Sequence, residues 1–301
     1  MASTREMRMR IRSIKNLAQV TRALETVSAS KVRRAIQMNN QTKPYAEKAW
    51  QVLVHLAQQP GRESLHPLLA DRDTAAKDMV IMISSDRGLA GAYNVNIVRH
   101  TLLEFKGHDA EVAYVTVGRK GRDMMIRRRM PVIAEFSRLS ANPSFAEVAP
   151  IGRLAVDEYL QGEVDEVFIA YTEFKTILKQ EPVVRRLLPL KPTEMDDERI
   201  KAGGVKHTES VYSYEPDAVD LLGEIIPRFT ALQIYQAILS AQASEHAARM
   251  VAMRNATESA KELISILQLD YNKARQASIT NDMLDISGGA EALAQATSGR
   301  G

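Results

Sequence analysis

The segment after the apolar run at 80–83 has the composition of a phosphate-binding turn. Two serines, Asp86, Gly88 and Gly91 follow this run. A strand, a glycine-bearing turn and a helix can together bind phosphate through backbone N–H groups. The spacing nevertheless matches neither G-x-G-x-x-G nor G-x-x-x-x-G-K-[ST], and Asp86 would repel a bound anion. The segment therefore predicts a strand-to-helix turn that shapes a protein contact, with nucleotide binding as the alternative.

Other residues that could do chemistry are scattered. Gly118–Arg122 (GRKGR) could attract phosphate at a helix N-terminus, although a turn with basic neighbours explains it as well. The chain has 6 histidines and 0 cysteines, without an H-E-x-x-H pair or a G-x-S-x-G segment. The acidic run 196–198 is typical of a solvated loop. We therefore predict no catalytic residue, no cofactor site and no metal site in this chain.

The C-terminal part predicts one long helix. No Gly or Pro lies between Pro227 and Gly288, which allows about 60 residues and roughly 90 Å of unbroken helix. A three-four ladder of the coiled-coil type runs through it, at residues 232, 235, 239, 242, 246, 249, 253, 256, 260, 263, 267, 270, 274, 277, 281 and 284. Gln242, His246 and Arg249 interrupt the ladder, as do 270 and 281. These polar residues favour antiparallel pairing with the other terminal helix over a homodimeric coiled coil.

The N-terminal part predicts the partner helix. Ser3–Glu6 has the form of a capping box, and the chain then has neither Pro nor Gly before Pro44. Leu17, Val20, Leu24 and Val27 fall on one apolar stripe of this helix. We expect the helix to resume after Pro44 and to end near residues 60–61.

The middle of the chain predicts an α/β domain with a mostly parallel sheet. Short apolar or alternating runs predict strands at 78–84, 112–117, 132–136 and 165–172, with a further strand at 183–189. Helical patterns lie between them at 94–105, 120–128 and 145–160. The predicted organisation is an N-terminal coiled-coil helix over 1–75, an α/β globular domain over 76–210, a C-terminal coiled-coil helix over 211–290 and a disordered tail over 291–301. Within the globular domain, the charged and polar residues at 191–210 predict a loop.

Charge is concentrated at the start of the chain, although the 301 residues carry a net charge of only +3. The basic residues there are Arg5, Arg8, Arg10, Arg12, Lys15, Arg22, Lys31, Arg33 and Arg34, opposed by Glu6 and Glu25. No aromatic residue interleaves with them, which disfavours nucleic-acid binding, and the pattern continues into a helix, which disfavours a transit peptide. A basic helical face that meets water or an acidic protein remains the favoured interpretation. No apolar run is long enough to span a bilayer.

Three stretches together resemble the gamma subunit family of F-type ATP synthases, the central shaft of the rotor. They are RIRSIKNLAQVTRALETVSASKVRRA at 10–35, ISSDRGLAGAYNVN at 83–96, and 243–293 with YNKARQASIT at 271–280. The resemblance covers nearly the whole chain. Ala90 stands where many members of the family have cysteine, and the chain lacks the regulatory cysteine pair of the chloroplast form.

The resemblance implies a Rossmann-like α/β domain inserted between two terminal helices that pair antiparallel. It implies a non-catalytic rotor subunit that couples rotation of a proton-driven c ring to conformational change in catalytic beta subunits. The implied partners are three alpha and three beta subunits around one gamma, the epsilon subunit and the c-subunit ring, without nucleic acid. The implied location is the cytoplasmic side of a bacterial plasma membrane, peripheral through the complex. A structural coiled-coil scaffold is the alternative function.

The resemblance also implies contact residues. It places Arg275, Gln276 and Thr280 against a loop of a catalytic beta subunit. It places Tyr212 and Glu215 in the foot that faces the c ring or the epsilon subunit.

Overall fold

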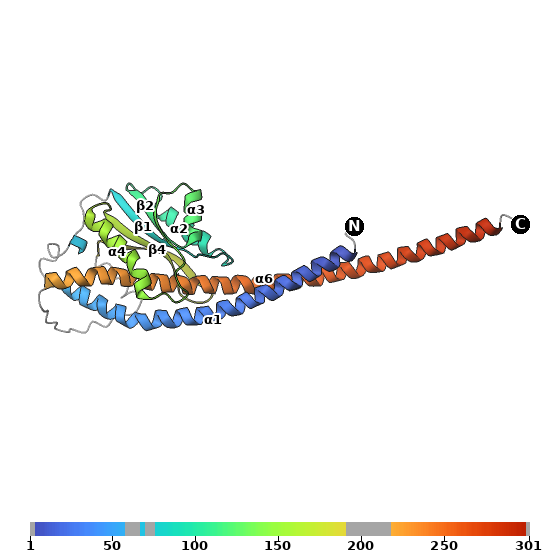
Figure 1. Cartoon of the computed structure of the whole chain (residues 1–301), viewed down its shortest axis with the longest axis horizontal. Coiled ribbons are helices and arrows are strands. Elements are labelled where there is room, and N and C mark those ends of the chain that lie inside the picture. Colours follow the sequence, from blue (N-terminus) through green and yellow to red (C-terminus); the bar gives the residue numbers. More distant parts are fainter. Residues whose placement is uncertain (1–3, 58–66, 70–75, 191–217, 299–301) are drawn as a thin grey trace. The chain divides into compact units, whose positions relative to one another are not determined.

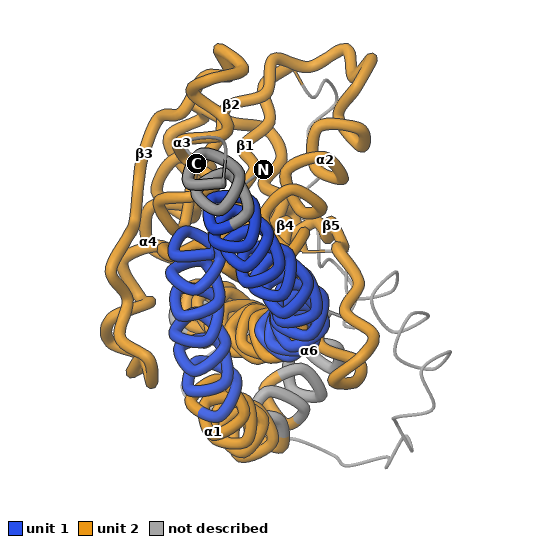
Figure 2. Tube along the Cα trace, turned by 90° about the vertical axis from the view of Figure 1, so that its right-hand side faces the viewer, with its two compact units in different colours: residues 1–26, 252–301 blue, residues 27–251 orange. Residues whose placement is uncertain are grey.

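A computed structural model describes residues 4–57, 67–69, 76–190 and 218–298 (Figure 1). The chain divides into two compact units, which Figure 2 colours separately. One unit comprises 1–26 and 252–301, and the other comprises 27–251. The predicted boundaries at 75/76 and 210/211 fall at or within residues outside the described ranges, so they stay predictions.

The larger unit contains a five-stranded sheet with the order β3-β2-β1-β4-β5. The strands are β1 (Lys77–Ile83), β2 (Glu111–Val117), β3 (Val132–Phe136), β4 (Glu166–Phe174) and β5 (Gln180–Leu188). The pairs between β3, β2, β1 and β4 are parallel, and β5 pairs with β4 antiparallel. This confirms the predicted α/β class with its mostly parallel sheet.

Alternating residues of each central strand enter two different cores. Met79, Ile81 and Ile83 of β1 pack into a core with α4 (Phe145–Gln161) and the first part of α6 (Ala218–Ser298). Val80 and Met82 pack on the other face, with α2 (Tyr93–Glu104) and α3 (Arg119–Arg127). Because strand side chains alternate between faces, an apolar run such as β1 is buried on both sides. A short 3₁₀ helix, η2 (Pro67–Leu69), adds the buried Leu68 to the first core.

Both terminal helices continue through residues at which the sequence patterns predict an interruption or an end. α1 (Thr4–Ala57) continues through Pro44 and does not stop there. Pro44 and Asn40 are both exposed, so water can bond to the Asn40 carbonyl that loses its helical N–H donor. Ser3, the first residue of the predicted capping box, lies outside the described residues.

α6 also passes through residues that the sequence treats as breakers. It includes Pro227 and continues past Gly288 to Ser298, although we predicted a disordered tail over 291–301. A Cβ atom added at Gly288 or Gly289 would meet open space, so no close contact requires glycine at either position. The residues after Gly289 are mostly strong helix formers, which accounts for the continuation.

In the smaller unit, α1 and α6 run antiparallel (Figure 1), and the buried residues are Ile11, Thr21, Met253, Thr257 and Ala260. The buried Thr21 and Thr257 hydroxyls lie 2.7 Å apart, and Thr257 also donates to the Met253 carbonyl at 2.8 Å. Leu17, Val20 and Val27, three of the four residues of the predicted packing stripe, are 57%, 55% and 52% exposed, so the prediction is wrong for them. The seam of the smaller unit instead combines apolar residues with two threonines that share a hydrogen bond.

Candidate functional site

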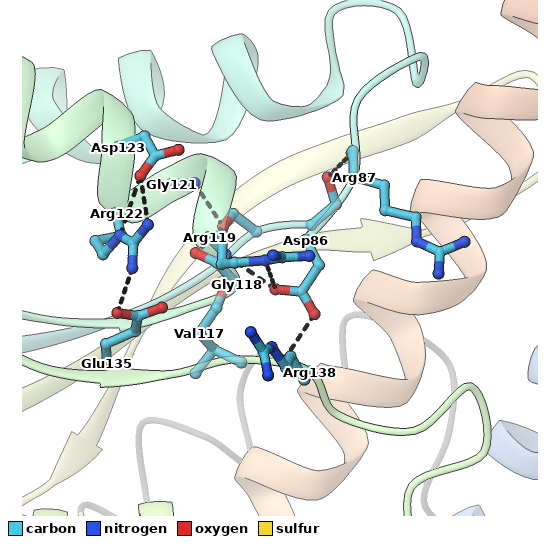
Figure 3. A network of polar contacts seen from close by, with 12 residues as sticks. Asp86, Arg87, Val117, Gly118, Arg119, Gly121, Arg122, Asp123, Glu135 and Arg138 are labelled. Atoms are coloured by element: carbon cyan, nitrogen blue, oxygen red, sulfur yellow. Dashed lines mark hydrogen bonds and ion pairs between the residues drawn. The ribbon is translucent and has the colours of Figure 1, made fainter.

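The loop after β1 caps the N-terminus of α3 with hydrogen bonds from backbone and side-chain atoms (Figure 3). A helix leaves its first N–H groups without partners inside the helix. Here the first three bond to the β1 loop, from Arg119 N to Asp86 Oδ1 (3.1 Å), from Lys120 N to Ser85 O (3.0 Å) and from Gly121 N to Ser84 Oγ (2.9 Å). The donors that a phosphate at Gly118–Arg122 would need are therefore engaged within the protein.

Two glycines of α3 allow this close contact. A Cβ atom at Gly118 would lie 2.4 Å from the Ser84 carbonyl oxygen, and Gly118 also has a φ of +99°. A Cβ atom at Gly121 would lie 2.5 Å from the Ser84 hydroxyl. Both positions therefore exclude a side chain for steric reasons, and the glycines of GRKGR serve the contact between strand and helix.

Asp86 connects three segments through its two carboxylate oxygens (Figure 3). Oδ1 accepts from Arg119 N, and Oδ2 accepts from Arg138 N at 2.8 Å, just beyond β3. The Arg119 guanidinium Nε lies 3.6 Å from Oδ1. This carboxylate occupies the place that an anion would take at the α3 N-terminus, so residues 84–92 form the predicted strand-to-helix turn, and their contact with another protein stays a prediction.

The other side of the same loop is attached to α6 by Arg249. Its guanidinium donates to the Gly88 carbonyl from Nε at 3.3 Å and from Nη2 at 3.2 Å. Nη2 also pairs with Glu245 Oε1 at 2.6 Å, and both side chains are largely buried. The arginine thus links the loop and one turn of α6 with a single planar group.

Electrostatics fix the protonation states beside Arg249. Burial raises the pKa of Glu245, and the neighbouring Arg249 cation opposes that rise. Burial and the positive charges of Arg249 and Lys31 lower the pKa of His246 to about 4. His246 is therefore neutral near pH 7, and its Nδ1, 3.2 Å from Arg249 Nη1, must accept because a guanidinium can only donate.

Sequence reasoning missed the role of this group, although a signal was present. His246 and Arg249 are two of the residues that interrupt the predicted ladder of α6. Glu245 lies four residues before Arg249, the spacing of a helical ion pair. A polar interruption that contains such a pair indicates a second packing partner for the helix.

The predicted contact residues lie on α6 in the smaller unit. Arg275, Gln276 and Thr280 are exposed, and the Thr280 hydroxyl donates to the Gln276 carbonyl at 3.0 Å. The structure brings these three together on consecutive turns of one helix. Tyr212 and Glu215 lie outside the described residues.

No group of three or more His, Cys, Asp or Glu in the described ranges could hold a metal ion. Among the helices described here, none is long and apolar enough to cross a membrane.

The chain is similar to proteins of one family along nearly its whole length. The family model described as ATP synthase matches residues 3–293. The ATP synthase gamma chain of Dehalococcoides mccartyi strain 195 is 44% identical over 295 residues, which cover 98% of this chain and 100% of the relative. The ATP synthase gamma chain of Roseiflexus sp. strain RS-1 is 42% identical over 298 residues, with coverage of 98% and 100%.

Solved structures share the fold. One chain in the cryo-EM structure of the Euglena gracilis mitochondrial ATP synthase (OSCP/F1/c-ring, rotational state 3) has a TM-score of 0.65 at 20% identity, with 96% of this chain and 94% of that chain covered. A chain of the Tetrahymena thermophila mitochondrial ATP synthase central stalk and c ring has a TM-score of 0.58 at 22% identity, with coverage of 79% and 99%. From the family match and the identity to the bacterial relatives, the chain belongs to the ATP synthase gamma chain family.

Proposed function

We propose that this chain is the rotating shaft that couples turning of a membrane c ring to conformational change in catalytic beta subunits. Its central-stalk role in an F-type ATP synthase follows from the family. The observation that supports the mechanical part is the continuity of α6 over 81 residues, paired with α1 by the Thr21–Thr257 contact. A helix without an interruption can transmit torque along its axis.

The proposed mechanism is allosteric. A shaft with different side chains on different faces makes different contacts with each catalytic subunit at a given angle. Each set of contacts favours one conformation of that subunit, and rotation changes which subunit receives which set. The shaft supplies no catalytic group in this scheme, and the nucleotides are bound by its neighbours.

The chain belongs to a membrane-associated complex, and its bacterial relatives are consistent with association with the cell membrane. In finer detail, we propose three alpha and three beta subunits around one copy of this chain, with the epsilon subunit and the c ring at its foot. We also propose proton coupling and a peripheral position on the cytoplasmic side of a bacterial plasma membrane. Tyr212 and Glu215 are the proposed foot contacts.

Arg275, Gln276 and Thr280 are the proposed contact with a catalytic beta subunit. All three are exposed on α6, and nothing that the structure describes covers them. The Arg275 guanidinium can form two parallel hydrogen bonds to a carboxylate, which a lysine cannot reproduce. Gln276 offers an amide beside it, and Thr280 follows one turn later.

The test is coupled ATP synthesis by the assembled enzyme in membrane vesicles. We expect the Arg275→Ala, Gln276→Ala double variant to lower the rate about tenfold or more, since losing a paired interface arginine costs about 2 kcal/mol or more. Arg275→Lys should recover only a small part of the rate. The Lys273→Ala, Ser278→Ala double variant alters exposed neighbours on the same helix and should leave the rate near wild type. Equal rates for all variants would show that these residues make no functional contact.

A further inference from the structure

A groove of about 520 Å³ lies between α3 and the edge strand β3, on residues that the shaft mechanism does not use. Its apolar lining includes Ile126 at the end of α3 and Ile133 on β3, which are 56% and 51% exposed. Met130 lies between them in sequence, lines the same groove and is only partly buried. Two large aliphatic side chains are therefore exposed to solvent within one small surface.

An irregularity in the sheet determines the position of Ile133. β2 and β3 pair Tyr114 with Val132 and Val115 with Ala134, so Ile133 is an extra residue without a partner on β2. Such a bulge bends an edge strand and redirects a side chain, and it also disfavours addition of another strand to that edge. The groove is therefore suited to side-chain docking and not to extension of the sheet.

The cations around the groove differ in what they already contact. Arg122 is already paired with two carboxylates, Asp123 from Nη2 at 2.7 Å and Glu135 from Nη1 at 2.6 Å (Figure 3). Arg127 and Arg128 donate to carbonyls of the last turn of α3, at 3.0 Å and 3.1 Å. Arg129 is exposed and lines the groove, and no described carboxylate lies within ion-pair distance of it. One free guanidinium thus stands beside an apolar surface.

We infer that this groove docks a segment of another subunit of the complex that carries an apolar anchor followed closely by a carboxylate. The anchor would fit between Ile126 and Ile133, and the carboxylate would pair with Arg129. An apolar anchor surrounded by a polar rim is the usual form of a binding hot spot. This inference rests on the chain's place in an ATP synthase, but not on the proposed beta-subunit contact.

Charge argues for an acidic partner over a second copy of this chain. The surface of α3 and the turn after it carries Arg119, Lys120, Arg122, Arg127, Arg128 and Arg129 against Asp123. A symmetric pair through this face would bring the same cations together, which is unfavourable. A segment that carries Asp or Glu would be attracted by the same field.

The experiment is site-directed photocrosslinking in the purified, intact ATP synthase. The photoreactive residue p-benzoylphenylalanine replaces Ile133, and in a second preparation Ile126, both of which are exposed positions. We expect each to give one crosslink to the same short segment of another subunit, with an Asp or Glu within a few residues of the linked position.

Charge reversal then tests the role of Arg129. Arg129→Glu should lower the yield of that crosslink about tenfold at low salt, whereas the matched Arg127→Glu should leave it close to wild type. If Arg129→Glu prevents assembly, Arg129→Gln replaces it and should reduce the yield in the same direction. The inference is overturned if no crosslink forms, if it leads to a second copy of this chain or to phospholipid, or if Arg129 changes have no effect. If one of these results occurs, retained ATP synthesis in the same samples would show that the groove inference, and not the shaft function, had failed.

Discussion

Asp78 is a buried carboxylate that should make the stability of the α/β domain depend on pH. Its side chain is fully buried at the start of β1, and neither oxygen has a hydrogen-bond partner in the described structure. The imidazole of His108 lies beside it, with Nε2 3.4 Å from Oδ2. Burial, followed by the charge of Glu166, raises the pKa of Asp78 from the ordinary 3.8 to about 6, and His108 partly opposes this.

The magnitude follows from the two pKa values. A carboxyl with a pKa of about 6 in the folded protein and 3.8 in the unfolded chain binds more protons when folded. The free energy of unfolding therefore falls as pH rises, and the full loss is about 3 kcal/mol once pH exceeds the folded value. Between pH 4.5 and pH 7.5 the expected loss is about 2 kcal/mol.

The assay is urea unfolding of the full chain from pH 4.5 to pH 7.5, with Asp78→Asn as the perturbation. Asn cannot ionise, so the free energy of unfolding of the variant should rise by about 2 kcal/mol relative to that of wild type between pH 4.5 and pH 7.5. Asp109→Asn changes an exposed carboxylate beside His108 and should give a constant difference. A difference between Asp78→Asn and wild type that does not change with pH would refute the assignment of this loss to Asp78.

Three further substitutions test the network around the β1 loop. Gly118→Ala places a Cβ atom 2.4 Å from the Ser84 carbonyl oxygen and should lower the free energy of unfolding, measured in urea, by more than about 2 kcal/mol. In the control Gly107→Ala the added Cβ atom meets nothing within 4 Å, so that variant should show only the strain of its φ of +84°. Asp86→Ala should cost about 1–3 kcal/mol and accelerate amide hydrogen exchange at the two N–H groups that its carboxylate accepts, and unchanged exchange would contradict the capping role. Arg249→Met should cost about 3–5 kcal/mol because it leaves Glu245 buried without its partner, and a second change, Glu245→Gln, should restore part of that loss if the pairing is correct.

The sequence predicts the α/β domain closely because its signals are local. β1 is an apolar run buried on both faces of the sheet, and β3 alternates partly buried and exposed residues. The predicted ranges 78–84 and 132–136 match 77–83 and 132–136 in the structure. The helices between them lie where apolar periodicity changes from two to about 3.6. Such short-range patterns are determined by nearest neighbours, so a single sequence contains them.

Other features depend on contacts between residues far apart in the sequence, which local patterns do not reveal. The glycines near 118–122 resemble a phosphate site until Ser84 is seen to bond the Gly121 N–H. Arg249 resembles a flaw in a coiled coil until its bonds to the Gly88 carbonyl appear, 161 residues away. In both cases the sequence shows the residue type, but the residue that it contacts lies in a distant segment of the chain.

The most informative failure is the apolar stripe on α1. Leu17 and Val20 face solvent, while Thr21, one position away, is buried against Thr257. A helix pair formed for its own stability would bury its leucines and valines, since each contributes about 1.5–3 kcal/mol on burial. On α6 in the same unit, Ile266 and Leu269 are likewise exposed at 58% and 56%. The buried residues of this unit combine the large apolar Ile11 and Met253 with the small or polar Thr21, Thr257 and Ala260. Aliphatic side chains left on the outside of a helix pair are expected where a partner encloses the pair. The exposed aliphatic residues therefore support a shaft that turns within a surrounding protein.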